Sequence, residues 1–254
     1  MTYVAEARTA IRVAAADRAN FLLQALGMAI NNGFVLAMWF LFFGGFRSVG
    51  GWTMPDVALL IGLLATTVGL AGVICGGYRD LAAAILRGEP DGLLVQPRSV
   101  LPRLLARDSN LTGWGDIATG VILLAAFSRL STHDAPWLVF VLLCGLTIFV
   151  ATAVLFACLA FWAKGARSFA RDLTDFIIMF SSWPGSIHTP TTKLIVYTVF
   201  PAGFIVLAPV ALLRHPALSG ALTIGAAAAG YAFIAIWAFE QGLRRYRDGA
   251  APGV

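Results

Sequence analysis

Catalysis would need nucleophiles, acid–base pairs or metal ligands at defined spacing, and this sequence offers few. Lys164 and Lys193, the two lysines, lack the glycine and Ser/Thr context of a phosphate-binding loop. His133, His188 and His215 each stand alone, with no second ligand at helical spacing, and no serine lies in a nucleophile-elbow motif. The sequence therefore predicts a protein that is not an enzyme, with no metal site and no cofactor of its own.

Polar side chains inside long apolar runs are a second group that could act on a ligand. Such residues either line a polar pathway or form hydrogen bonds between helices, and the second use is at least as common. Both uses remain open for six residues: Asn31, Asn32, Thr66, Thr67, Ser181 and Ser182.

Two carboxylates, Asp116 and Asp175, lie about one turn inside apolar runs. An intramembrane carboxylate is a candidate proton relay. Arg107 and Arg171 are near them in the sequence, so we expect these carboxylates to pair with arginines at the membrane surface.

The segment from Tyr78 to Asn110 is patterned like a structured connection between two apolar runs. Residues 81–87 favour a short helix that Gly88 can end, and residues 89–92 favour a turn. Pro97, Pro102 and the apolar residues between them suggest a second short helix that leads into the third span. We expect two small helices that expose both apolar and charged groups, an arrangement suited to docking another protein.

The elements that must hold these residues are mostly apolar. Hydrophobic residues make up 59% of the 254-residue chain and charged residues only 12%, which is too apolar for one soluble core. A helix needs about 20 apolar residues to cross a bilayer. We predict an all-α integral membrane protein, a single transmembrane domain over residues 1–254, with six spans at residues 21–43, 57–77, 111–130, 137–162, 166–185 and 217–239.

Two further elements flank or interrupt these spans. Residues 1–20 are predicted to form an amphipathic helix in the membrane interface. Before the last span, the prolines at 190, 201 and 209 break the apolar pattern, and we expect residues 187–213 to form a re-entrant hairpin in the outer leaflet. A kinked span followed by an ordinary outer loop is the alternative.

Basic residues predict the orientation. All but four of the 18 lysines and arginines lie near the N-terminus, in residues 78–110, in residues 163–172 or in the tail. Cytoplasmic segments carry such an excess, so both termini are predicted to be inside. The pI near 9.5 therefore reflects contact with membrane lipids, and no nucleic-acid partner is expected. The four exceptions are Arg47, Arg129, Lys193 and Arg214.

With these features, the chain resembles the permease subunits of ATP-binding-cassette (ABC) exporters of the type-2 class. The likeness rests on six spans with both ends inside, on the proline-rich region before the last span, and on G-E-P-D-G-L-L-V-Q-P-R-S at residues 88–99. That segment is similar to the family pattern G-x-x-D-x-L-L-x-x-P-x-S between spans two and three. V-G-G-W-T-M-P-D at residues 49–56 is similar to the start of span two in a bacterial subgroup, and Thr53, Pro55 and Asp56 favour a helix start there.

The resemblance implies a non-catalytic permease of the bacterial plasma (inner) membrane. Its partners would be a second permease, identical or homologous, and a cytoplasmic ABC ATPase dimer that holds ATP and Mg. Residues 187–213, with Pro190, Pro201 and Pro209, would cover the exit path. Residues 78–110 would be the cytoplasmic coupling region, and the residues that meet the ATPase would be Arg87, Gly88, Glu89, Asp91, Leu93, Leu94 and Pro97.

Two questions stay open in the sequence. Gly62, Gly69 and Gly76 recur every seven residues, and this row of small residues serves either a seam between two permeases or packing within the chain.

An ATP-driven exporter is the predicted function, and a proton-driven secondary transporter that uses Asp116 or Asp175 is the alternative. A membrane-embedded scaffold or enzyme is a weaker third, because no span carries paired catalytic groups.

Overall fold

The computed structural model describes residues 3–48, 50–128, 130–163 and 165–248. Val49 of the span-two motif, together with Arg129 and Lys164 of the charge pattern, lies outside the described residues. The described part of the chain is helical and contains no strand, so the all-α prediction is confirmed.

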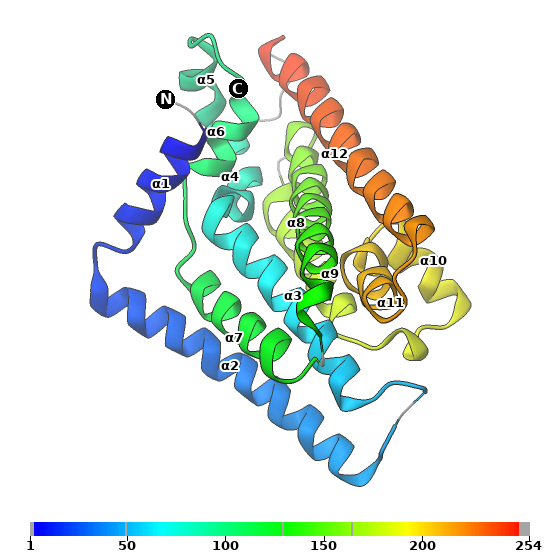
Figure 1. The fold of residues 1–254 in the computed structure, drawn as a ribbon. Helices are drawn as coiled ribbons and strands as arrows, with labels where there is room; N and C mark the ends of the chain where they lie inside the picture. Colours follow the sequence, from blue (N-terminus) through cyan, green and yellow to red (C-terminus); the bar gives the residue numbers. More distant parts are fainter. Residues whose placement is uncertain (1–2, 49, 129, 164, 249–254) are drawn as a thin grey trace.

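Seven longer helices form the body of the described structure. They are α1 (Tyr3–Ala14), α2 (Arg18–Gly45), α3 (Met54–Ile74), α7 (Thr112–Ala126), α8 (Ala135–Cys158), α9 (Ala166–Ser181) and α12 (Leu218–Arg247). Shorter helices connect them: α4 (Leu81–Leu86), α5 (Glu89–Leu94), α6 (Val100–Ala106), α10 (Pro190–Thr198) and α11 (Ala208–Arg214). Helices α4 to α6 lie at the same end of the molecule as both termini (Figure 1).

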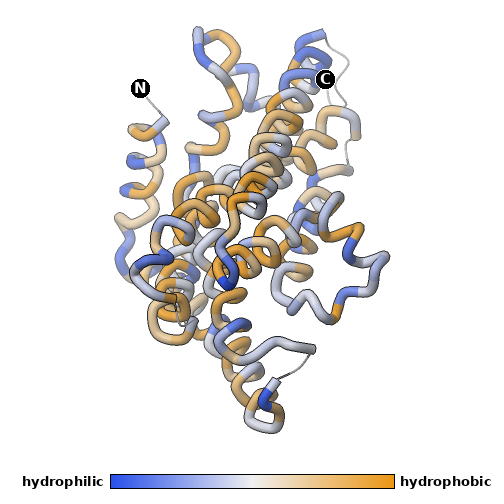
Figure 2. The backbone as a smooth tube through the Cα atoms, turned by 45° about the vertical axis from the view of Figure 1, so that its right-hand side comes forward, coloured by the Kyte–Doolittle hydropathy of each residue, from blue (hydrophilic) through white to orange (hydrophobic). Residues whose placement is uncertain are grey.

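Among the residues that the structure describes, four helical stretches are long and apolar enough to cross a membrane. They contain α2, α3, α8 and α12, and the bent pair of α10 and α11 would make a fifth. The chain is therefore a multi-pass membrane protein. Helix α7 is apolar but has 15 residues, about 22 Å of helix against a hydrocarbon core of roughly 30 Å. Hydrophobic residues run along the long helices, and hydrophilic residues gather at their ends and in the connections (Figure 2).

Helix α3 is the centre of the fold. Its side chains are buried almost continuously from Val57 to Val73, mainly against α7 and α8. At its start, the Asp56 carboxylate accepts hydrogen bonds from the Thr53 amide at 2.8 Å and the Thr53 hydroxyl at 2.7 Å. Asp56 also pairs with Arg214 at the end of α11, at 2.7 Å. The predicted helix start is therefore confirmed, and the same carboxylate attaches α11 to α3.

Glycines bring α3 and α7 into backbone contact. A Cβ atom added at Gly69 would lie 2.7 Å from the Gly113 carbonyl oxygen, and one at Gly62 would lie 2.9 Å from the Leu124 side chain. Helix α7 also contributes a glycine to this contact, since a Cβ atom added at Gly120 would collide with Thr66. The glycine row therefore serves packing within the chain.

The prolines before the last long helix mark helix starts and a break. Pro190 begins α10, Pro201 lies between the two helices, and Pro209 lies in the first turn of α11, where a missing amide hydrogen costs little. The axis turns by 86° between α10 and the stretch Gly203–Arg214, whose first turn is a π-helix. Ile205, Val206 and Val210 are buried in the main core, so this bent pair is an integral part of the fold.

Candidate functional site

Residues 78–110 form three short helices around one glycine. Helix α4 ends at Leu86, and Gly88 has a φ of +78°, a left-handed conformation that favours glycine. Helix α5 then begins at once with Glu89. The expected turn over residues 89–92 is therefore wrong. Pro90 in the first helical turn and two acidic side chains beside it are favourable at a helix N-terminus, and they start α5 instead.

Asp80 is the centre of an ion-pair network in this region. Its carboxylate lies 2.6 Å from Arg87, 3.4 Å from Arg107 and 3.7 Å from Arg167. Partial burial raises the pKa of Asp80, but the hydrogen bond and charge of Arg87, with the charges of Arg107 and Arg167, outweigh burial and lower the pKa below its ordinary value. Because Arg167 belongs to α9, the network attaches the short helices to a helix of the main body.

Glu89 belongs to the same network. It pairs with Arg87 at 2.7 Å and also contacts Arg107 at the end of α6. Arg87 and Glu89, both expected to meet a partner protein, are thus engaged within the chain, where they hold α4, α5 and α6 together.

The end of α5 divides its apolar residues between the core and the surface. Leu93 and Leu94 are half-buried against the core cluster that contains Leu104 and Phe161. Val95 is 84% exposed. We call the exposed residues Asp91, Val95, Gln96 and Pro97 the docking tip.

Val95 was missed in the sequence. The run Leu93–Leu94–Val95 could have indicated it. A helix cannot turn three successive side chains toward one core, so one of these apolar residues had to be exposed.

The docking tip is also attached to the last long helix. Asp91 is hydrogen-bonded to the Tyr246 hydroxyl, and Tyr246 is buried against the Phe161 ring. A Cβ atom at Gly88 would lie 3.4 Å from that hydroxyl. Movement of α5 would therefore pull directly on the C-terminal end of α12.

Helix α1 packs against the same region. Glu6 pairs with Arg103 of α6 at 3.4 Å, and the Tyr3 hydroxyl donates to the Ile74 carbonyl at 3.0 Å. The predicted N-terminal helix is therefore present, and it is fastened to both α6 and the end of α3.

Most of the polar residues in the spans are used for helix contacts. The Asn32 amide donates to the Asp116 carboxylate at 2.8 Å and so joins α2 to α7. Asp116 is 4% exposed. The expected pairing of Asp116 with Arg107 is wrong, because Arg107 lies in the Asp80 network. Asn31, by contrast, is exposed on the outer surface of α2.

The Thr and Ser pairs lie in or near the core. The Thr66 hydroxyl donates to the Gly62 carbonyl at 2.7 Å, and the Ser182 hydroxyl donates to the Ile178 carbonyl at 2.8 Å. Thr67 and Ser181 are fully buried. The hydroxyls of Thr66 and Ser182 are therefore bonded to backbone carbonyls four residues earlier in the chain.

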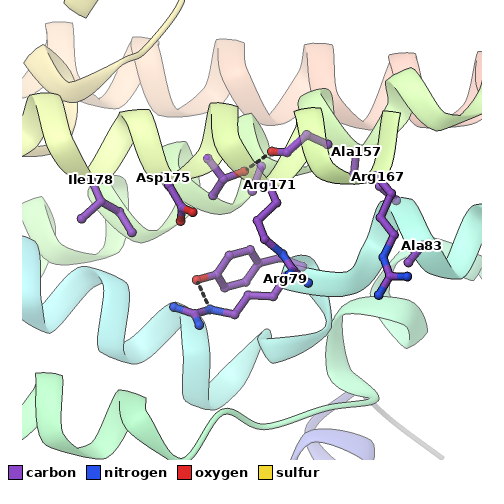
Figure 3. A pocket seen from close by; sticks show the side chains of 12 residues that line it. Arg79, Ala83, Ala157, Arg167, Arg171, Asp175 and Ile178 are labelled. Carbon is purple, nitrogen blue, oxygen red and sulfur yellow. Dashed lines mark hydrogen bonds between the residues drawn. The ribbon is translucent and has the colours of Figure 1, made fainter. Parts of the chain in front are cut away.

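A polar cavity of about 290 Å³ opens between the 3-10 turn Gly76–Asp80, α4, α8 and α9 (Figure 3). Arg79, Arg167 and Arg171 line it together with Asp175, so positive charge dominates. The Arg79 guanidinium donates to the Tyr78 hydroxyl at 3.2 Å. Helix α9 is amphipathic, and three of its charged side chains, Arg167, Arg171 and Asp175, line this cavity. Arg171 and Asp175 thus share a cavity wall.

Comparison with known proteins gives one match. A family model described as "ABC-2 family transporter protein" matches residues 29–249. The matched range starts within α2, includes the docking tip and the polar cavity, and ends just beyond α12. No curated protein and no solved structure matches the chain.

Proposed function

The chain belongs to the ABC-2 family of transporter proteins, and from this premise we propose that it is the permease subunit of an ATP-driven exporter. In this proposal, two permeases, identical or homologous, enclose the pathway in a bacterial plasma membrane. A separate cytoplasmic ABC ATPase dimer binds ATP and Mg. The chain itself makes and breaks no covalent bond.

The observation that carries the proposal is the construction of the docking tip. It exposes an apolar residue, Val95, beside polar ones, which suits a protein interface better than water alone. The ion-pair network around Asp80 joins α5, which carries the tip, to Arg167 of α9. Asp91 joins the tip to α12 through Tyr246. Closure of an ATPase dimer on the tip would therefore move two long helices together.

In this proposal the chain crosses the membrane six times, which would put the docking tip and both termini on one side. Helices α2, α3, α7, α8, α9 and α12 would cross, and the bent pair α10–α11 would enter the outer leaflet without crossing. This arrangement agrees with the arginines of α1, of residues 78–110 and of the last turn of α12, which would all face the cytoplasm. The bent pair would then cover the exit path.

The polar cavity is the part of the proposed pathway nearest the cytoplasm. Charged side chains at membrane depth need water or protein around them, and lipid cannot supply it. The charged side chains of α9 would therefore line a water-filled entrance to the pathway. Arg79 and Arg171 would be the first side chains that a substrate meets there.

Substitution of Val95 tests the coupling. In V95D, a carboxylate would have to be desolvated in the interface, so we expect co-purification of the ATPase to fall at least tenfold, which corresponds to about 1.4 kcal/mol. V95A keeps a small apolar side chain and should retain most of the ATPase. R245E, a charge change at an exposed site on α12, should retain all of it.

The proton-driven alternative has one observation in its favour, the buried Asp116 with its Asn32 donor. A transporter of that kind would work without an ATPase, so V95D would leave its transport unchanged and an ionophore would abolish it. Normal ATPase recovery with V95D would overturn the coupling role of the docking tip.

A further inference from the structure

A second and larger hollow, separate from the polar cavity, runs along the last long helix. This groove has a volume of about 900 Å³ and lies between α6, α8 and the C-terminal half of α12, with Tyr3 and the end of α3 at one side. Its floor on α8 is formed by Leu146, Val150 and Val154. The groove is open to the surface and takes no part in the ion-pair network around Asp80.

The groove changes from apolar to basic along its length. On α12 it is lined first by Ala232, Ala235, Ile236 and Phe239, and then by Glu240, Arg244 and Arg247. They lie along residues 232–247 of α12, about 24 Å of helix. Arg98, from the connection between α5 and α6, lines the groove too, and that connection lies at the same end of the molecule as the C-terminal end of α12 (Figure 1). Arg244 and Arg247 lie beside Glu240 at this basic end.

Both halves of the groove limit what can occupy it. A small soluble anion would leave the apolar floor uncovered, and an apolar helix would bring no anionic group to Arg244 and Arg247. An amphiphile with an anionic headgroup satisfies both, because its acyl chain covers the apolar walls and its phosphate pairs with guanidinium groups. Basic sites at the membrane edge are where anionic headgroups bind.

We propose that this groove binds one anionic phospholipid, with an acyl chain between α8 and α12 and the phosphate at Arg244 and Arg247. The lipid would brace α12 against α6 and α8, next to the helix end that Asp91 and Tyr246 attach to the docking tip. This site goes beyond the proposed function. Lipid binding requires only that Arg244 and Arg247 lie at the depth of the lipid headgroups, and it does not depend on the ATPase.

Lipid titration of the purified full-length chain tests the site. Phosphatidylglycerol and phosphatidylcholine with the same acyl chains are added to the delipidated protein in detergent, and bound lipid is counted by native mass spectrometry. We expect tighter binding of phosphatidylglycerol, and a loss of roughly tenfold or more in its affinity in R244E/R247E. R245E is the matched control, since Arg245 is in the same turn but does not line the groove.

Three results would overturn the proposal. Phosphatidylglycerol and phosphatidylcholine could bind equally to the wild type. R245E could lose as much affinity as R244E/R247E, which would indicate general surface attraction. R244E/R247E could instead keep its lipid and lose dimerisation, measured in the same spectra, which would assign the groove to a second copy of the chain. Normal circular dichroism of the double variant confirms that the outcome reports on binding and not on folding.

Discussion

At the scale of single residues, neighbouring positions of the same type have different roles. Asn31 and Asn32 are adjacent in α2, yet only Asn32 reaches the buried Asp116 carboxylate of α7. The helical rotation of about 100° per residue is enough to separate a lipid-facing or pathway-facing side chain from one that joins two helices. A hydrogen bond to a buried carboxylate holds α2, which is otherwise largely exposed, against the body.

Removing the donor tests this contact. N32A leaves the Asp116 carboxylate buried without its partner, so we expect a loss of about 1–3 kcal/mol in stability. N31A changes an exposed amide of the same type and should change stability by less than about 0.5 kcal/mol. Thermal unfolding of both variants in the same detergent measures the difference. Equal melting temperatures for the two variants would contradict the assigned role of Asn32.

At the scale of elements, close helix contact depends on glycines that face one another. Gly69 of α3 meets the backbone of α7 at Gly113 and Ile117, and no side chain fits between them. The two helices contact each other along their lengths, and α3 is buried at the centre as a result. This contact fixes the short helix α7 against the centre of the fold.

A single methyl group tests the contact. The Cβ atom of G69A would lie 2.7 Å from the Gly113 carbonyl oxygen, so α7 must move outward, and we expect a loss of about 1–3 kcal/mol. G27A in α2 is the control, because no atom lies within 4 Å of its added Cβ. Cross-linking or thermal unfolding in detergent compares the two. If G69A is as stable as G27A, the packing of α3 on α7 is looser than described.

The sequence predicted some elements well and others poorly, for physical reasons. Long apolar runs predicted α2, α3, α8 and α12, because burial in lipid requires continuous hydrophobicity. The glycine row of α3 predicted a close approach but left the neighbour open, since periodicity in one helix does not identify the helix that packs on it. Residues 89–92 were predicted as a turn because Pro, Asp and Gly favour turns, although the same types also favour a helix start.

The candidate site was predicted in outline. Its location between the second and third apolar runs follows from the charge pattern and from the motif at residues 88–99. The ion pairs of Glu89 and Arg87 within the chain could not be predicted from the sequence. Arg107 and Arg167 are distant in the sequence and approach Asp80 only in the folded chain. Val95 was overlooked for a related reason, since its exposure depends on how α5 is rotated against the core.

At the scale of the whole molecule, a continuous set of contacts connects the docking tip to two long helices. The docking tip lies at the end that holds both termini, and ion pairs and the Asp91–Tyr246 contact join it to α9 and α12 (Figure 1). Helix α9 borders the polar cavity, and α12 borders the larger groove along its C-terminal half. A force on the tip would thus reach the cavity through one helix and the groove through the other.

The most direct test of this account asks which protein lies against Val95 in the intact membrane. A photo-reactive amino acid placed at position 95 of the full-length chain is activated in cells, and the cross-linked products are identified by mass spectrometry. The account predicts an adduct with an ABC ATPase, formed at position 95 and missing when the same probe replaces Leu194, an exposed residue of α10. Adducts at position 95 with lipid alone, or ATPase adducts from position 194, would contradict it.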